Sequence, residues 1–168
     1  MIEPGGPEEW PAAVVHGLIG RGLTLATAES LTAGLLAATL AEVPGASGTL
    51  QGGVIAYQNH VKQNLLGVDA DLLARHGAVH PEVARQMAEG ARRATGADVG
   101  LSTTGVAGPA PHQGQPVGTV YVGVAGLGRE AGEPAEVEVL RLSVDGDREA
   151  IRRGTVQQAL LAVLGHWA

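Results

Sequence analysis

The chain contains no cysteine and no phenylalanine, and only two tryptophans and two tyrosines among its 168 residues. Without cysteine it can form no disulfide, no thiolate nucleophile and no cysteine-ligated zinc or iron–sulfur site. Because aromatic residues are so few, valine, leucine, isoleucine and alanine must fill the core. Any tyrosine in an interior position therefore stands out as a candidate functional residue.

The sequence also lacks an excess of basic residues and a long apolar run. Its formal net charge is -6, so no basic stripe can neutralise a nucleic-acid backbone, although one local anion site still fits this composition. No stretch reaches the roughly 18 uninterrupted apolar residues of a membrane span, and the acidic, Pro/Gly-rich start is the reverse of a signal peptide. We therefore expect a cytoplasmic protein that binds neither nucleic acid nor membrane.

Size and composition predict one domain. A chain of 168 residues with 45% apolar residues can bury a single core of ordinary size. We expect residues 1–7 to be a flexible N-terminal extension and residues 8–168 to form the domain, which we expect to assemble as a homo-oligomer.

The six histidines form neither an HxH nor an HExxH pattern, and no carboxylates lie at metal-ligand spacing. We expect no metal and no cofactor. His60 and His80 fall near the predicted ends of strands, where they are candidates to line a pocket.

Helical and strand patterns alternate along the chain. One-sided apolar spacing or Ala/Leu-rich composition predicts helices at 8–20, 32–43, from 81 onward and at 148–164, with short helical pieces up to residue 75. Strands are predicted at 23–28, 53–57, 98–104, 117–125 and around 137–139, the last two paired antiparallel across a polar linker at 126–135. This alternation gives the α/β class, with a mixed sheet covered by helices on both faces.

Ser30 lies between a predicted strand and a predicted helix. A serine at such a turn exposes its hydroxyl at the rim of the sheet, and we expect the amides of Thr32, Ala33 and Gly34 to face the group that it attacks. Serine and threonine are also preferred helix caps, and the local pattern by itself favours a capping role.

Lys62 is the only lysine of the chain, whose other ten basic residues are all arginine. This bias suggests that position 62 requires a property that lysine has and arginine lacks. Arginine stays protonated in proteins, whereas a desolvated lysine becomes a neutral amine and can act as the base for a serine. The alternative is a solvated lysine on the helix that carries Val61, Leu65 and Leu66.

Tyr57 closes the predicted strand 53–57, five residues before Lys62. At that rim it would orient the lysine, relay a proton or stack on a flat heteroaromatic ring. The alternative is an ordinary tyrosine at a strand end, with its hydroxyl in water.

A glycine- and proline-rich loop at 105–116 follows the strand 98–104. Glycines there would let the backbone amides near Thr104, Gly105 and Gly108 approach an anion closely. The loop matches neither a Walker motif nor a dinucleotide-binding fingerprint, so an ordinary surface loop is the alternative.

Three arginines begin the last predicted helix. Arg148 and Arg152 share one of its faces, so one of them can bind a phosphate or carboxylate in a bidentate manner. We expect Arg152 and Arg153 to be solvated and paired with nearby acids.

Many short motifs occur in a fixed order after residue 10: AESLTAG at 28–34, VPGAS at 43–47, GGVIAY at 52–57 with Lys62, LLGV at 65–68, GAV at 77–79, AEGA at 88–91, TGVAGP at 104–109, PVGTVY at 116–121 and GDR at 146–148. In these motifs the chain resembles the CinA carboxy-terminal domain family, whose stand-alone members include nicotinamide-mononucleotide amidases. The resemblance implies a three-layer α/β/α sandwich. It also implies hydrolysis of nicotinamide mononucleotide to nicotinate mononucleotide and ammonia.

The resemblance assigns roles residue by residue. It implies Ser30 as nucleophile, Lys62 as base, Tyr57 as an assisting residue and Arg148 as a ligand contact, with the loop from Thr104 to Gly108 beside the phosphate and ribose. The chain departs from the family at Ala33, where a glycine is usual, at His80-Pro81 and at 109–112, where a glycine run is usual. These departures leave two alternatives open: a non-catalytic nucleotide-binding or partner-binding module, and a Ser–Lys amidase for another small amide.

Overall fold

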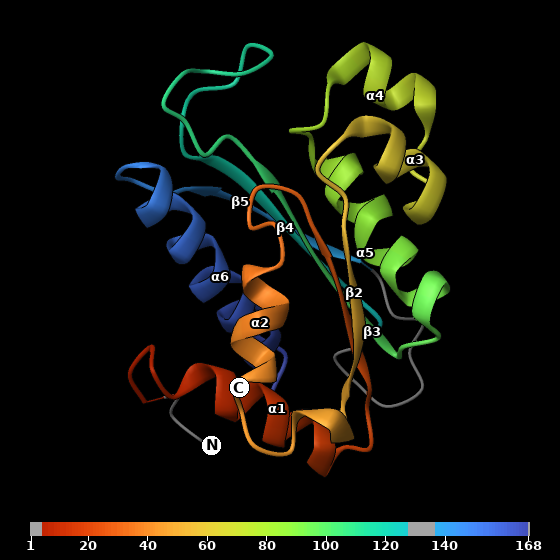
Figure 1. The fold of residues 1–168 in the computed structure, drawn as a ribbon, viewed down its shortest axis with the longest axis vertical. Helices are drawn as coiled ribbons and strands as arrows, with labels where there is room; N and C mark the ends of the chain where they lie inside the picture. The colour runs from red at the N-terminus through yellow and green to blue at the C-terminus, as the bar shows by residue number, and fades with distance from the viewer. Residues whose placement is uncertain (1–4, 128–136, 168) are drawn as a thin grey trace.

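A computed structural model describes residues 5–127 and 137–167 (Figure 1). The elements follow in the order α1 (Trp10–Gly20), β1 (Leu25–Glu29), α2 (Leu35–Ala41), a 3-10 turn (Ala46–Gly48), β2 (Leu50–Ile55), α3 (Asn59–Leu66), α4 (Ala70–His76), α5 (Pro81–Thr95), β3 (Val99–Gly105), β4 (Thr119–Ala125), β5 (Glu138–Ser143) and α6 (Arg148–Gly165). No helix in these ranges is long and apolar enough to cross a membrane.

The five strands form one mixed sheet in the order β2-β1-β3-β4-β5. β1 pairs in parallel with β2 and β3, while β3, β4 and β5 pair antiparallel. The predicted antiparallel pair near the end of the chain is therefore confirmed, although most of the predicted linker lies outside the described residues, as do residues 1–4 of the predicted extension. The carboxyl ends of β1, β2 and β3 meet at one edge, where Glu29 lies beside Ile55 and Thr103.

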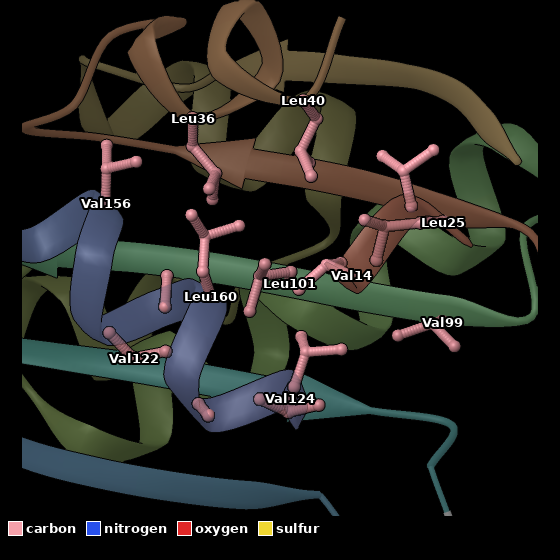
Figure 2. Packing of buried hydrophobic residues seen from close by; sticks show 14 of the residues in the cluster. Val14, Leu25, Leu36, Leu40, Val99, Leu101, Val122, Val124, Val156 and Leu160 are labelled. Carbon is pink, nitrogen blue, oxygen red and sulfur yellow. The ribbon is translucent and has the colours of Figure 1, made fainter. Parts of the chain in front are cut away.

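Helices cover both faces of the sheet, with α1, α2 and α6 on one side and α3, α4 and α5 on the other (Figure 1). On the first side, apolar side chains of the helices pack on those of the sheet (Figure 2), among them Val14, Leu36, Leu40, Val156 and Leu160 over Leu25, Leu101, Val122 and Val124. Burying each such side chain contributes about 1.5–3 kcal/mol. The predicted three-layer α/β/α sandwich is confirmed.

On the second side, α5 packs closely against the strands because they carry small residues there. A Cβ atom built on Gly100 would lie 1.9 Å from the carbonyl oxygen of Ala88, and one built on Gly123 would lie 2.6 Å from that of Ala84. The hydroxyl of Ser102 donates to the same Ala84 oxygen at 2.6 Å. This contact fixes α5, against which α3 packs.

Two predicted boundaries beside Ser30 are wrong. β2 ends at Ile55 rather than at 57, so Tyr57 lies in the loop between β2 and α3. α2 begins at Leu35 rather than at 32, because Ala33 and Gly34 have positive φ angles of 48° and 95° and form a tight turn instead of helix. Because alanine favours helix, the Ala/Leu-rich composition of residues 32–43 predicted helix at the position of this turn.

Replacing Ala33 by glycine is expected to stabilise the fold. The left-handed conformation costs a non-glycine residue roughly 1–2 kcal/mol, which outweighs the extra conformational entropy that glycine loses on folding. Ala33→Gly should raise the free energy of unfolding by about 1 kcal/mol and the Tm by roughly 2–4 °C.

The matched control is Ala38→Gly, the same change at an exposed position inside α2. There glycine should lower the free energy of unfolding by about 0.5–1 kcal/mol. Urea unfolding measures both variants, and a loss of stability in Ala33→Gly would contradict the assignment of strain to Ala33.

Candidate active site

Ser30 lies directly after β1 at the edge where the three parallel strands end. Its amide donates to the carbonyl oxygen of Thr103 in β3 at 3.0 Å, and the amide of Ala56 donates to the carbonyl oxygen of Glu29 at 2.8 Å. These bonds extend the pairing of β1 with both neighbours. The backbone at Ser30 is thereby fixed on either side, and the side chain is buried with 9% exposure.

The side chain of Lys62 reaches Ser30 from α3 and is completely buried. Its Nζ atom lies 3.0 Å from Oγ of Ser30, 2.7 Å from the carbonyl oxygen of Ala56 and 3.2 Å from that of Tyr57. Burial lowers the pKa of Lys62 from 10.5 to about 8, because the desolvated ammonium loses its hydration. A substantial fraction of this lysine is therefore neutral near physiological pH.

The three neighbours of Nζ can accept the three N–H groups of an ammonium, whereas a neutral amine keeps two N–H donors and gains one lone pair. The carbonyl oxygens of Ala56 and Tyr57 can only accept, so they take the two N–H groups. The lone pair then remains for the third neighbour, the hydroxyl of Ser30. In its neutral form Lys62 can accept the hydroxyl proton of Ser30.

A cavity of about 520 Å³ opens in front of this pair. Its wall includes Ser30, Lys62, Tyr57, Arg148 and every residue of the segment 104–113, most of which belongs to the predicted glycine-rich loop. None of the described residues that line it is acidic, although the chain carries a net charge of -6. The cavity is thus a local environment suited to an anionic group.

Arg148 connects three segments at the mouth of the cavity. It occupies the first turn of α6, whose N-terminus is capped by Asp147. Its Nη1 donates to the carbonyl oxygen of Gly108 at 2.8 Å and its Nη2 to the hydroxyl of Tyr57 at 2.9 Å. Further N–H groups of the guanidinium remain for a bound anion.

Tyr57 contacts Lys62 through its main chain and Arg148 through its hydroxyl. Its hydroxyl accepts a hydrogen bond from Arg148, while its backbone carbonyl contacts Lys62. The side chain is half exposed and lines the cavity. Tyr57 therefore orients the lysine through its main chain, and its ring is free to contact a ligand.

Thr104 and Gly105 at the end of β3 and Gly108 in the loop that follows all line the cavity. The hydroxyl of Thr104 donates to the carbonyl oxygen of Ala78 at 2.8 Å, which fixes this side of the wall. Gly105 has no room for a side chain, because a Cβ atom would lie 2.7 Å from the carbonyl oxygen of Thr119.

Thr32, Ala33 and Gly34 lie outside the cavity wall, which corrects the expectation that their amides face a ligand together. The hydroxyl of Thr32 is paired with that of Thr103 at 2.7 Å. The amide of Ala33 donates to the carbonyl oxygen of Ser30, which closes the tight turn. The methyl group of Ala33 is exposed and does not narrow the cavity.

The amides at the start of α2 are also occupied. Those of Leu36 and Ala37 donate to the carboxylate of Glu29 at 2.8 and 3.0 Å. Glu29 is 1% exposed and precedes Ser30 directly. Glu29 is the only charged residue of the buried strand β1. This isolated carboxylate was the sequence signal for its contact with the amides of Leu36 and Ala37.

Arg152 is the second residue whose role the sequence did not reveal. Instead of pairing with an acid in solvent, it donates to the carbonyl oxygens of Leu31 and Thr32. The expectation for Arg153 is confirmed, since it pairs with Glu149 at 2.9 Å.

Of the histidines near the site, only His112 lines the cavity. His80 instead caps α5, where its Nδ1 accepts from the amide of Glu82, and His60 lies on α3 outside the cavity wall. In the part of the chain that the structure describes, no three His, Asp or Glu side chains gather closely enough to hold a metal ion.

Comparison with known proteins places this geometry in a family. Residues 8–166 match the model of the CinA C-terminal domain. A CinA-like protein of Anaeromyxobacter sp. (strain Fw109-5) is 51% identical over 154 residues, which are 91% of this chain and 36% of that protein. A putative competence-damage inducible protein of Desulforamulus reducens is 49% identical over 143 residues, covering 85% of this chain and 33% of that protein.

Solved structures of proteins from the same family have the same fold as this chain. The crystal structure of the competence damage-inducible protein A from Klebsiella pneumoniae superposes with a TM-score of 0.87 at 34% identity, covering 98% of this chain and 100% of that chain. The competence/damage inducible protein of Agrobacterium tumefaciens gives the same TM-score at 32% identity, covering 100% and 99% of the two chains. The chain spans about a third of the length of the curated relatives that it matches. It belongs to the CinA C-terminal domain family.

Proposed function

We propose that the chain hydrolyses the carboxamide of nicotinamide mononucleotide to nicotinate mononucleotide and ammonia, with Ser30 as nucleophile and Lys62 as base. The observation that carries this proposal is the 3.0 Å contact between Oγ of Ser30 and Nζ of the fully buried Lys62. A serine paired with a neutral lysine is an established alternative to the Ser–His–Asp triad.

In the first half of the reaction, neutral Lys62 takes the proton of Ser30 as Oγ attacks the carboxamide carbon. The carbonyl oxygen becomes an oxyanion. The amide of Leu31, which lines the cavity, donates to no described residue, and the residue after a nucleophilic serine is a usual oxyanion donor. We assign the Leu31 amide to the oxyanion.

In the second half, the protonated Lys62 gives its proton to the leaving nitrogen, the C–N bond breaks and ammonia departs. A water molecule then attacks the ester formed on Ser30, with the neutral lysine again as base. The ester C–O bond breaks, nicotinate mononucleotide leaves and Ser30 regains its proton.

The cavity supports an anionic, mononucleotide-sized substrate. Its volume of about 520 Å³ falls in the range of ligand pockets, Arg148 offers donors to a phosphate, and no acidic residue lines the described wall. The half-exposed ring of Tyr57 can stack on the pyridine ring of the substrate.

Purified protein should release ammonia from nicotinamide mononucleotide, and removing either member of the pair should abolish this turnover. Ser30→Ala removes the nucleophile. Lys62→Arg keeps a positive charge but cannot become neutral, so we expect kcat to fall about 10²–10⁴-fold. An ammonia-coupled assay measures these rates.

The matched control is Gln63→Ala, an exposed position on the same helix outside the cavity wall, which should retain full activity. Undiminished turnover in Lys62→Arg would overturn the base assignment. Saturable binding of the mononucleotide without any ammonia release from the unmodified protein would instead indicate a binding module.

The pH profile should report the titration of Lys62. Only the neutral amine can accept the serine proton, and the pKa of Lys62 lies near 8. Below that value kcat/KM should rise about tenfold per pH unit, and above it the rate should level off. A rate that is flat from roughly pH 6 to 10 would contradict the mechanism.

Replacing Arg148 should weaken recognition of the phosphate. Arg148→Gln removes a charged donor from the mouth of the cavity, so kcat/KM for the mononucleotide should fall about 10–100-fold. Nicotinamide riboside lacks the phosphate, so it should react slowly with both the unmodified protein and Arg148→Gln. The substitution should lower kcat/KM less for the riboside than for the mononucleotide.

Comparing nicotinamide, its riboside and its mononucleotide distinguishes the remaining alternative. Equal turnover of all three by the unmodified protein would indicate an amidase for small amides in general. An equal loss with riboside and mononucleotide in Arg148→Gln would overturn the phosphate contact.

A further inference from the structure

Arg152, in α6, binds the backbone of the turn that directly follows the nucleophile Ser30. Its Nε donates to the carbonyl oxygen of Leu31 at 2.9 Å, and its Nη2 donates to that of Thr32 at 2.9 Å. Both acceptors belong to the two residues that follow Ser30. The side chain is half-buried and does not line the cavity that contains Ser30, although it lines a second cavity together with Arg148.

These two bonds determine where the amides of the turn point. In a planar trans peptide the N–H group lies opposite the C=O group. With the carbonyl of Leu31 directed at Arg152, the amide of Thr32 points away from it. With the carbonyl of Thr32 held likewise, the amide of Ala33 is directed to the carbonyl oxygen of Ser30, as observed. The guanidinium therefore holds two successive peptide planes, and it shares the carbonyl of Thr32 with the amide of Leu35, which donates to it at 3.0 Å.

The turn needs such support because its conformation is unfavourable. Ala33 has a φ angle of 48°, a conformation that costs about 1–3 kcal/mol and persists only where neighbouring contacts impose it. On one side the carboxylate of Glu29 binds the amides that begin α2, and on the other side Arg152 binds the two carbonyls. The turn is thus held between a carboxylate and a guanidinium.

We propose that Arg152 is a positioning residue for the reaction, which holds the turn that follows Ser30, and with it the nucleophile and the Leu31 amide, by binding the carbonyls of Leu31 and Thr32. The inference rests on the proposed function, since it assigns a residue that positions the nucleophile and the oxyanion donor of that mechanism. An arginine is required because its planar fork binds two oxygens at once, whereas a lysine offers a single compact charge.

Kinetics of Arg152 variants test this role. Arg152→Gln should lower kcat about 10–100-fold while KM changes less than about threefold, because displacing the nucleophile and the Leu31 amide affects the transition state more than substrate binding. The pH inflection near 8 should persist, since Lys62 is untouched. Arg152→Lys should be intermediate, and millimolar guanidinium should partly restore Arg152→Ala.

The control is Arg153→Gln, one residue along the same helix, where the exposed side chain pairs only with Glu149. It should keep the kcat of the unmodified protein. A kcat for folded Arg152→Gln within about twofold of the control would overturn the proposal. So would a rise in KM at constant kcat, or an Arg152→Ala loss that guanidinium leaves unchanged.

A reaction that needs no nucleotide separates this proposal from the proposed substrate. A fluorophosphonate modifies a nucleophilic serine, and its phosphoryl oxygen occupies the place of the oxyanion beside the Leu31 amide. Mass spectrometry gives the rate of Ser30 modification. Slower modification in Arg152→Gln than in Arg153→Gln supports the role of Arg152 even if nicotinamide mononucleotide is not hydrolysed. Equal rates in the two variants overturn it even if the mononucleotide is hydrolysed.

Discussion

The desolvation of a single amine determines the chemistry of this fold. Lys62 is completely buried, and its ammonium form has two carbonyl oxygens and one hydroxyl around it in place of water. Burying an unpaired charge is costly, so the lysine resists protonation. The loop between β2 and α3 supplies both carbonyls, which direct the lone pair of the neutral amine toward Ser30.

The mixed sheet brings this amine and its partners to one place. Three parallel strands end at one edge and deliver Ser30, the β2–α3 loop and Thr104 from distant parts of the sequence. Such an edge is where ligands gather in α/β proteins. The start of α6 completes the arrangement, because Arg148 faces the cavity while Arg152, one turn further, faces the back of the serine turn.

The sequence predicts the three layers of the α/β/α sandwich and the pair Ser30 and Lys62. It does not predict the contacts that orient this pair. Alternating periodicities reveal the α/β sandwich, and one lysine among ten arginines marks Lys62. Arg152, in contrast, binds backbone atoms 121 and 120 positions away, and any residue type supplies a carbonyl. The turn at Ala33 was hidden for a related reason, since alanine favours helix and only tertiary contacts impose its positive φ angle.

The protonation state of Lys62 is the central claim, and the composition of the chain makes it directly measurable. Because Lys62 is the only lysine, protein labelled with ¹³C at the lysine Cε carbon gives a single lysine signal in an NMR titration. A midpoint close to the pKa of about 8 is the predicted result. A midpoint at or above 10.5, the ordinary pKa of a solvated lysine, would contradict the account.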